Sequence, residues 1–425
     1  MIPGDIPLFI VLIWLFVFGA VVGSFLNVCI YRIPQHERLW DQLSGLNHPP
    51  SSCPYCKKRI LAIDNIPILG WIMLGGRCRF CRHAISIRYA LIEFFNGLLW
   101  VALYLAIVPA GFNARVDWSA LYSPLGALAQ PGLNHPMQVW LVNAQFIYFL
   151  ILAEALLVAT FIDFDLMIIP DGVTVPAMFA GVIGAAILGA PTLWPAWFFS
   201  TYELNGLQPV LPGWLHWMLY LPEQIPWFVA HPHWHGLFSS LLGLIVGGGT
   251  VWIVRILGHW AFQREAMGFG DVILMAMIGS FLGWQASLMV FFLVAPICAL
   301  VATSITFTLR SSREIPFGPY LSVGAMIVVL GWNPYFSKFE TFFSRGPLLP
   351  IVFLLMGLLF APLLVLTRFV KQRLGFQEEE EIIIEEWTSA DQLSFYDSKK
   401  ACDTPWPGEA SGQSRLHSDR WRGTR

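Results

Sequence analysis

Charge is the scarcest property of this 425-residue sequence, because Asp, Glu, Lys and Arg together make up only 12% of it. A soluble globular protein carries about 25% charged residues, so a soluble protein is excluded. The net charge of -2 offers no basic surface for phosphates, which excludes a nucleic-acid-binding protein. Cysteine is also sparse, with seven in the chain, which excludes a disulfide-stapled secreted module.

Long apolar runs take the place of the missing charge, and 56% of the residues are hydrophobic. Since one membrane crossing needs about 20 apolar residues, these runs supply about eight or nine spans. The sequence therefore predicts an all-α polytopic membrane protein. The expected spans lie near 8–31, 86–108, 138–162, 172–190, 236–257, 271–284, 286–308, 317–333 and 348–368.

The first apolar run is interpreted as a retained span and not as a signal peptide. It lacks a basic stretch in front, its first charge is Asp5, and it runs on to Arg32. Within another span, Gly243 and Gly247 have the spacing of small residues that let two membrane helices pack closely.

The positive charges predict the orientation of the chain. Segment 32–85 holds eight Lys and Arg residues, whereas segment 191–235 holds none. Because short basic loops stay in the cytoplasm, segment 32–85 and the C-terminal tail are placed inside and the N-terminus outside. Four parts are expected: a first span at 1–31, a cytoplasmic four-cysteine loop domain at 32–85, a transmembrane core at 86–370 with outer-face insertions at about 109–136 and 191–235, and a disordered cytoplasmic tail at 371–425.

Four cysteines give the strongest local signal. Cys53 and Cys56 form one CxxC pair, Cys78 and Cys81 form another, and twenty-one residues separate the pairs. Two such loops bring four thiolates into a tetrahedron around zinc, with backbone amides turned toward the sulfurs. Two disulfides or four free thiols are the alternatives, but disulfides seldom persist in the reducing cytosol. We therefore predict a structural zinc whose complete sulfur shell leaves no position for a reactive water.

Acids at the ends of spans are the candidate catalytic groups, because carboxylates near the membrane interior are costly. Asp163 is expected at the inner end of one helix, near Asp165, and Asp171 at the start of the next. Asp271 follows the turn formed by Gly268 and Gly270 and heads another helix. Two aspartates that share one site cannot both ionise comfortably, so such a pair can act as acid and base on one water.

Simpler roles are open for each acid. Asp171 and Asp271 suit helix caps, and Asp165 suits an interfacial charge that faces water. At the level of the whole protein, the alternatives to a peptidase are a carboxylate-dependent membrane transporter and a non-catalytic scaffold for pilus or secretion assembly.

The motifs together resemble the prepilin peptidases, which are GxGD-type membrane aspartic proteases. The resemblance extends over most of the chain. It is carried by Gly23–Val28, Tyr31–Pro34, the two CxxC pairs, Asn65–Pro67, Arg88–Tyr89 with Glu93, Ile162–Asp163, Pro170–Asp171, Gly268–Asp271 and Pro316–Leu321.

The resemblance implies that Asp163 and Asp271 are the catalytic pair and that Asp165 and Asp171 accompany the first. It implies a bacterial inner-membrane enzyme that cuts the basic leader of type IV prepilins or pseudopilins on the cytoplasmic side. It also implies, by resemblance alone, N-methylation of the new N-terminus with S-adenosylmethionine. The insertions at about 109–136 and 191–235 depart from a compact family member without touching these motifs.

Overall fold

The structure is a computed structural model that describes residues 7–36, 38–47, 51–108, 135–189, 212–220, 225–262, 267–308 and 316–332, with a few single positions elsewhere. Within these ranges the regular structure is helical, apart from two isolated β-bridges that join Ser52 to Arg59 and Arg77 to Ala84. The all-α prediction is therefore confirmed for the described residues. Residues 109–134, the tail at 371–425 and, apart from Leu355, the ninth expected span lie outside them.

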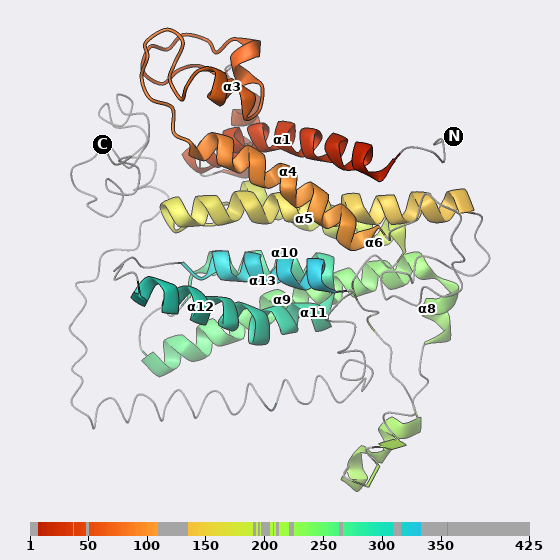
Figure 1. Ribbon diagram of the computed structural model, residues 1–425. Helices are drawn as coiled ribbons and strands as arrows, with labels where there is room; N and C mark the ends of the chain where they lie inside the picture. Colours follow the sequence, from red (N-terminus) through yellow and green to blue (C-terminus); the bar gives the residue numbers. More distant parts are fainter. Residues whose placement is uncertain are drawn as a thin grey trace. The chain divides into compact units, whose positions relative to one another are not determined.

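The longer helices follow the apolar runs (Figure 1). In chain order they are α1 (Leu8–Arg32), α4 (Arg88–Ile107), α5 (His135–Leu166), α6 (Asp171–Leu188), α9 (Pro232–Phe262), α10 (Phe269–Leu282), one continuous helical stretch made of α11 (Trp284–Met289), the π-helical segment Val290–Val294 and α12 (Ala295–Thr308), and finally α13 (Gly318–Gly331). Short helices lie between them: α2 (Leu39–Ser44), α3 (Leu69–Met73), α8 (Pro226–Ala230) and the 3-10 segments Ile33–Gln35, Gly45–Asn47, Ala62–Asn65 and Gly213–Tyr220.

Among the residues that the structure describes, six helical segments are long and apolar enough to cross a membrane. They are Leu8–Gln35, Arg88–Ile107, Trp140–Leu166, Asp171–Leu188, Pro232–His259 and Trp284–Ala302. Two of the other expected spans correspond to the shorter apolar helices α10 and α13. The chain is thus a multi-pass membrane protein in which each of the first eight expected spans has a helix.

Some helix ends differ from the expected ones. The span expected at 138–162 continues to Leu166, and Asp163 lies in the last turn of α5, at the helix end where it was expected. The break expected after residue 284 falls at Gly283 instead, where φ is 83°. Only glycine adopts this left-handed conformation readily, so it separates α10 from α11.

The described residues form two compact units. Unit 1 contains those up to Ala102 together with Phe161–Val173, and unit 2 contains Leu103–Thr160 and those from Thr174 onward. In unit 1, α1 and α4 pack closely because Gly19 and Gly23 lie against α4: a Cβ added to Gly23 would lie 2.8 Å from the Cα of Glu93. The Asn96 amide donates across this contact to the Gly19 carbonyl at 2.8 Å.

In unit 2, α9 packs along α10 through glycine (Figure 1). A Cβ added to Gly243 would lie 2.1 Å from the Gly279 carbonyl oxygen, and one added to Gly247 would lie 2.6 Å from that of Met275. The predicted small-residue packing of this span is confirmed. The Ser240 hydroxyl donates across the same contact to the Ser280 carbonyl at 2.7 Å.

Candidate active site and cysteine cluster

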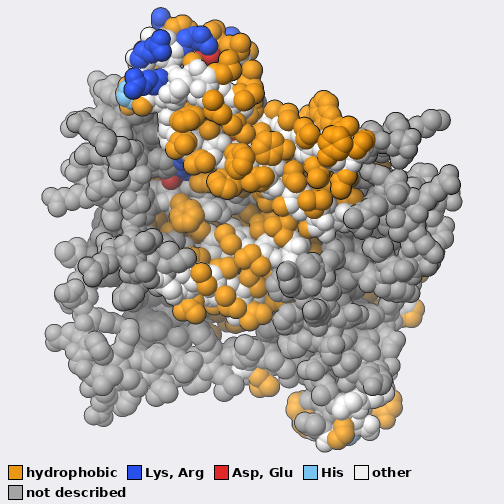
Figure 2. All heavy atoms as spheres, viewed as in Figure 1, with side chains coloured by type: hydrophobic (Ala, Val, Ile, Leu, Met, Phe, Trp, Pro, Cys, Tyr) orange, Lys and Arg blue, Asp and Glu red, His pale blue; other side chains and the backbone are white. Residues whose placement is uncertain are grey.

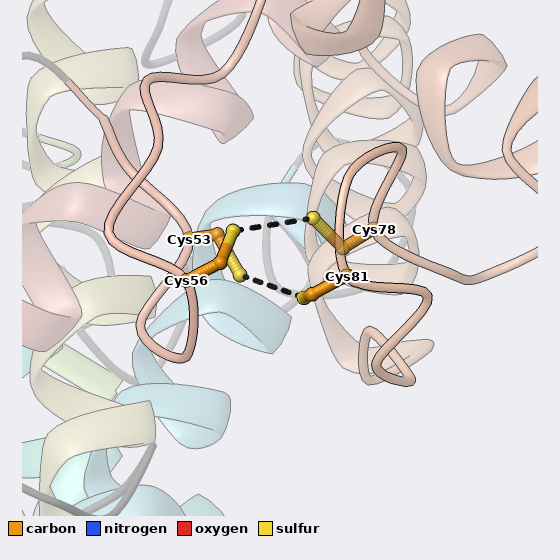
Figure 3. Close-up of side chains that lie close together, drawn as sticks. All are labelled: Cys53, Cys56, Cys78 and Cys81. Carbon is orange, nitrogen blue, oxygen red and sulfur yellow. Dashed lines mark hydrogen bonds between the residues drawn. The ribbon is translucent and has the colours of Figure 1, made fainter.

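The four cysteines of the two CxxC pairs face one another across two loops of unit 1 (Figure 3). The Sγ atoms of Cys53 and Cys81 lie 3.7 Å apart, and those of Cys56 and Cys78 lie 4.0 Å apart. All four sulfurs lie within 4.8 Å of one another. The predicted cluster is therefore formed by these cysteines.

The two loops have the same construction. The first cysteine of each donates its backbone N–H across the loop, Cys53 to Lys58 at 2.9 Å and Cys78 to His83 at 2.8 Å. The residue after each second cysteine is left-handed, with φ of 55° at Lys57 and 60° at Arg82. This backbone turns amides toward sulfur: the Cys53 sulfur accepts from the N–H groups of Tyr55 and Cys56, and that of Cys78 from Phe80 and Cys81.

This arrangement fits a tetrahedral metal ion. With zinc–sulfur bonds of about 2.3 Å, a tetrahedron has sulfur–sulfur edges of about 3.8 Å, close to the two contacts above. A disulfide would need about 2.05 Å, and the four cysteines are free thiols. Burial raises the pKa of the Cys53 thiol to about 11; burial acts the same way on Cys78, but there the hydrogen bonds outweigh it and lower the pKa to about 7. The cluster is consistent with a metal site.

Asp163 is buried, with 4% of its surface exposed, and lies in the last turn of α5. Two residues later, the Asp165 carboxylate forms an ion pair with Arg88 at 2.6 Å. Both of these side chains are mostly buried, at 15% and 13% exposed. Asp165 is therefore not an interfacial charge that faces water, which was the alternative. Its ion pair with Arg88 joins the end of α5 to the start of α4.

Asp171 is the first residue of α6 and is exposed. Beside it, the Gly172 N–H donates to the Gln42 side-chain oxygen at 2.6 Å, and the Gln42 amide donates to the His36 carbonyl at 2.8 Å. The buried Gln42 thus ties the start of α6 to the segment that follows α1.

Asp271 lies in the first turn of α10 and is buried, with 9% of its surface exposed. Its carboxylate accepts a hydrogen bond from the N–H of Gly268, the residue that caps this helix. The capping role is therefore present, because the contact satisfies an N–H that the helix leaves unpaired. Gly268 has an ordinary φ of -67°, so this structure does not use the special torsional freedom expected of it.

The structure divides the two candidate catalytic acids between its units, with Asp163 in unit 1 and Asp271 in unit 2. It brings together directly the four cysteines, Asp271 with Gly268, and Asp165 with Arg88.

Comparison with known proteins gives the family. Residues 17–107 match the bacterial peptidase A24 N-terminal domain, and residues 150–303 match the type IV leader peptidase family. The prepilin leader peptidase/N-methyltransferase of Pectobacterium carotovorum subsp. carotovorum is 30% identical over 75% of this chain and 92% of its own length. The chain belongs to the type IV leader peptidase family.

Other members have the same name and similar coverage. That of Dickeya chrysanthemi is 30% identical over 76% of this chain and 95% of its own, and that of Aeromonas hydrophila is 29% identical over 76% and 91%. No solved structure matches the chain significantly. The four cysteines lie in the first matched region, and all the acids and glycines of the predicted site lie in the second.

Sequence reasoning gave no role to two polar residues that the structure places in unit 1. Gln42 had no motif to signal it. Glu93 belonged to the motifs of the resemblance, and its carboxylate accepts hydrogen bonds from the Ile68 N–H at 2.7 Å and from the Ser24 hydroxyl. An acid five residues inside a span is the signal that marks it.

Proposed function

We propose that the chain is a membrane-embedded aspartic endopeptidase that cuts the basic leader of type IV prepilins or pseudopilins on the cytoplasmic side. The supporting observation is the position of two buried aspartates at helix ends inside the matched leader peptidase region. Asp163 lies in the last turn of α5, and Asp271 lies in the first turn of α10.

The path of the chain supports a common side for the two acids. If α5, α6, α9 and α10 each cross once, the end of α5 and the start of α10 emerge on the same face of the membrane. The ion pair of Arg88 with Asp165 agrees with this path, because it joins the start of α4 to the end of α5. Segment 32–85, with its eight Lys and Arg residues, precedes α4 and makes this face cytoplasmic.

We propose that Asp163 and Asp271 share one proton. The ionised carboxylate removes a proton from a water, which attacks the scissile carbonyl carbon, while the protonated carboxyl donates to the carbonyl oxygen. The acids then exchange roles, and one protonates the leaving amine as the C–N bond breaks. Asp165 and Asp171 support the site at the ends of α5 and α6, and Gly268 and Gly270 leave room beside Asp271.

The wider architecture follows from the same orientation. We propose about eight or nine spans in a bacterial inner membrane, with the N-terminus outside and the C-terminal tail in the cytoplasm. The four parts are those expected from the sequence: 1–31, 32–85, 86–370 and 371–425. Cys53, Cys56, Cys78 and Cys81 would hold a zinc ion that orders the loop domain.

We further propose methyl transfer from S-adenosylmethionine to the new N-terminus. Its support is the name N-methyltransferase that the relatives carry. Labelled methyl groups should appear on cleaved pilin when the enzyme and labelled S-adenosylmethionine are combined, and cleaved pilin without label would remove this activity.

The peptidase proposal is tested by co-expression with a prepilin that has a basic leader ending in Gly. Asp163→Asn and Asp271→Asn should each lower cleavage, read as a mass shift, by at least about 100-fold. The exposed Asp41 provides a control, and Asp41→Asn should cut normally. Normal cutting by either variant at equal membrane levels would show that the pair is wrong. A wild-type protein that leaves the prepilin uncut would favour a transporter, although transport sites usually lie near the bilayer midplane.

A further inference from the structure

Between the two CxxC loops lies a strongly apolar stretch, residues 60–74, which we call the interloop segment. It contains the 3-10 segment Ala62–Asn65 and helix α3. Six of its large apolar side chains are between 41% and 63% exposed, although a water-soluble lobe would bury most of them. They are Leu61, Ile63, Ile66, Leu69, Ile72 and Met73.

Basic residues flank the interloop segment on both sides. Lys57, Lys58 and Arg59 precede it, and Arg77, Arg79 and Arg82 follow it; all six are exposed. The single acid in residues 51–87 is Asp64, which pairs with Arg79. Figure 2 shows Lys and Arg gathered at one end of the lobe that the two CxxC loops and the interloop segment form, with hydrophobic side chains on the surface beside them.

Hydrogen bonds join the residue before α3 to α4, and α4 to α1. Ile68, just before α3, donates its N–H to Glu93 of α4 at 2.7 Å, and Glu93 also accepts from Ser24 of α1. Glu93 lies five residues inside α4, about 7.5 Å along the helix from Arg88. The start of α3 is therefore held beside α4, about 7.5 Å along that helix from its basic first residue.

The backbone at this contact is unusual. Ile68 has φ of 62° and ψ of -54°, and the Leu69 N–H closes a three-residue turn on the Pro67 carbonyl. Such a turn is rare for a β-branched residue. Glu93 accepts a hydrogen bond from the N–H of this residue, so the bond that holds the start of α3 beside α4 also stabilises its turn.

We propose that the interloop segment lies in the lipid headgroup region of the leaflet that α1 and α4 leave, with Leu69, Ile72 and Met73 against acyl chains and the flanking cations on anionic phospholipid. An apolar stretch between basic flanks, tethered at both ends by membrane spans, has the chemistry of an interfacial anchor. The proposal uses the membrane crossing of α1 and α4 and does not rest on the peptidase activity.

The test uses the full-length protein in lipid nanodiscs. The photo-reactive residue p-benzoylphenylalanine replaces Leu69, Ile72 or Met73 in separate variants, and Tyr55 of the first CxxC loop in a control variant. Nanodiscs of phosphatidylcholine alone are compared with nanodiscs that also contain phosphatidylglycerol. After irradiation, mass spectrometry identifies what is bonded to the label, and bound metal is measured to verify that each lobe is folded.

We expect phospholipid adducts at α3 positions, few at Tyr55, and a higher yield with phosphatidylglycerol. The combined substitutions Lys57→Gln, Lys58→Gln and Arg59→Gln neutralise the first basic flank. They should lower the ratio of interloop segments that lie in the lipid to those that do not by about fivefold per cation. Three results would overturn the proposal: no lipid adduct at any α3 position of a folded lobe, adducts to protein alone, which would mean that a second copy or another protein covers α3, or equal yields in the two lipids.

Discussion

Replacing Gly243 by alanine should reduce cleavage by moving the helix that presents Asp271. The added Cβ would lie 2.1 Å from the Gly279 carbonyl oxygen of α10. A carbon and a carbonyl oxygen approach to about 3.3 Å, so α9 and α10 must separate locally by about 1.2 Å. Asp271 lies two turns before Gly279 on the same helix.

The expected size of the effect follows from this displacement. Forcing an extra carbon into a tight contact costs about 1–3 kcal/mol of stability. A misplacement of about 1 Å at a reacting group lowers the rate by about 100-fold. Gly243→Ala should therefore lower the thermal unfolding midpoint modestly and the rate of leader cleavage strongly.

Gly249 provides a matched control on the same helix. A Cβ added there meets no atom within 4 Å, so Gly249→Ala should leave both the unfolding midpoint and cleavage unchanged. Both variants are measured in detergent by thermal unfolding and by the mass shift of a prepilin. If Gly243→Ala cuts at the wild-type rate, the packing of α9 against α10 does not position Asp271 and the reasoning is wrong.

Two other predictions concern unit 1. Cys78→Ser should abolish bound zinc, measured by atomic absorption. Leader cleavage should persist, because a four-sulfur shell gives no position to a reactive water. Loss of cleavage by a protein whose spans remain folded would show that the metal has a larger role. Arg88→Met and Asp165→Leu should each lower the thermal midpoint, since each removes the ion-pair partner of a mostly buried charge, and the double variant should lose less than the sum of the two. Additive losses would show that the ion pair contributes little.

Local spacing made the cysteine cluster predictable. Each CxxC loop closes on itself through bonds such as that of the Cys78 N–H to the His83 carbonyl, so six consecutive residues fix the shape of each loop. The helices were predictable for a similar reason, since a long apolar run in a membrane has to satisfy its own backbone. The end of α5 was placed a turn too early because helical hydrogen bonding continues through the two charged positions Asp163 and Asp165 to Leu166.

The contacts between helices were far less predictable, because they join positions distant in sequence. Arg88 and Asp165 are 77 residues apart, and Gln42 and Gly172 are 130 apart. In a soluble helix the apolar stripe shows which face is buried, but in a membrane the face toward lipid is as apolar as the face toward protein. Small residues give one signal of the packed face, which is why Gly243 and Gly247 were recognised. Polar residues such as Glu93 give a second signal, because an acid inside a span needs hydrogen-bond donors, and here the donors are the Ile68 N–H and the Ser24 hydroxyl.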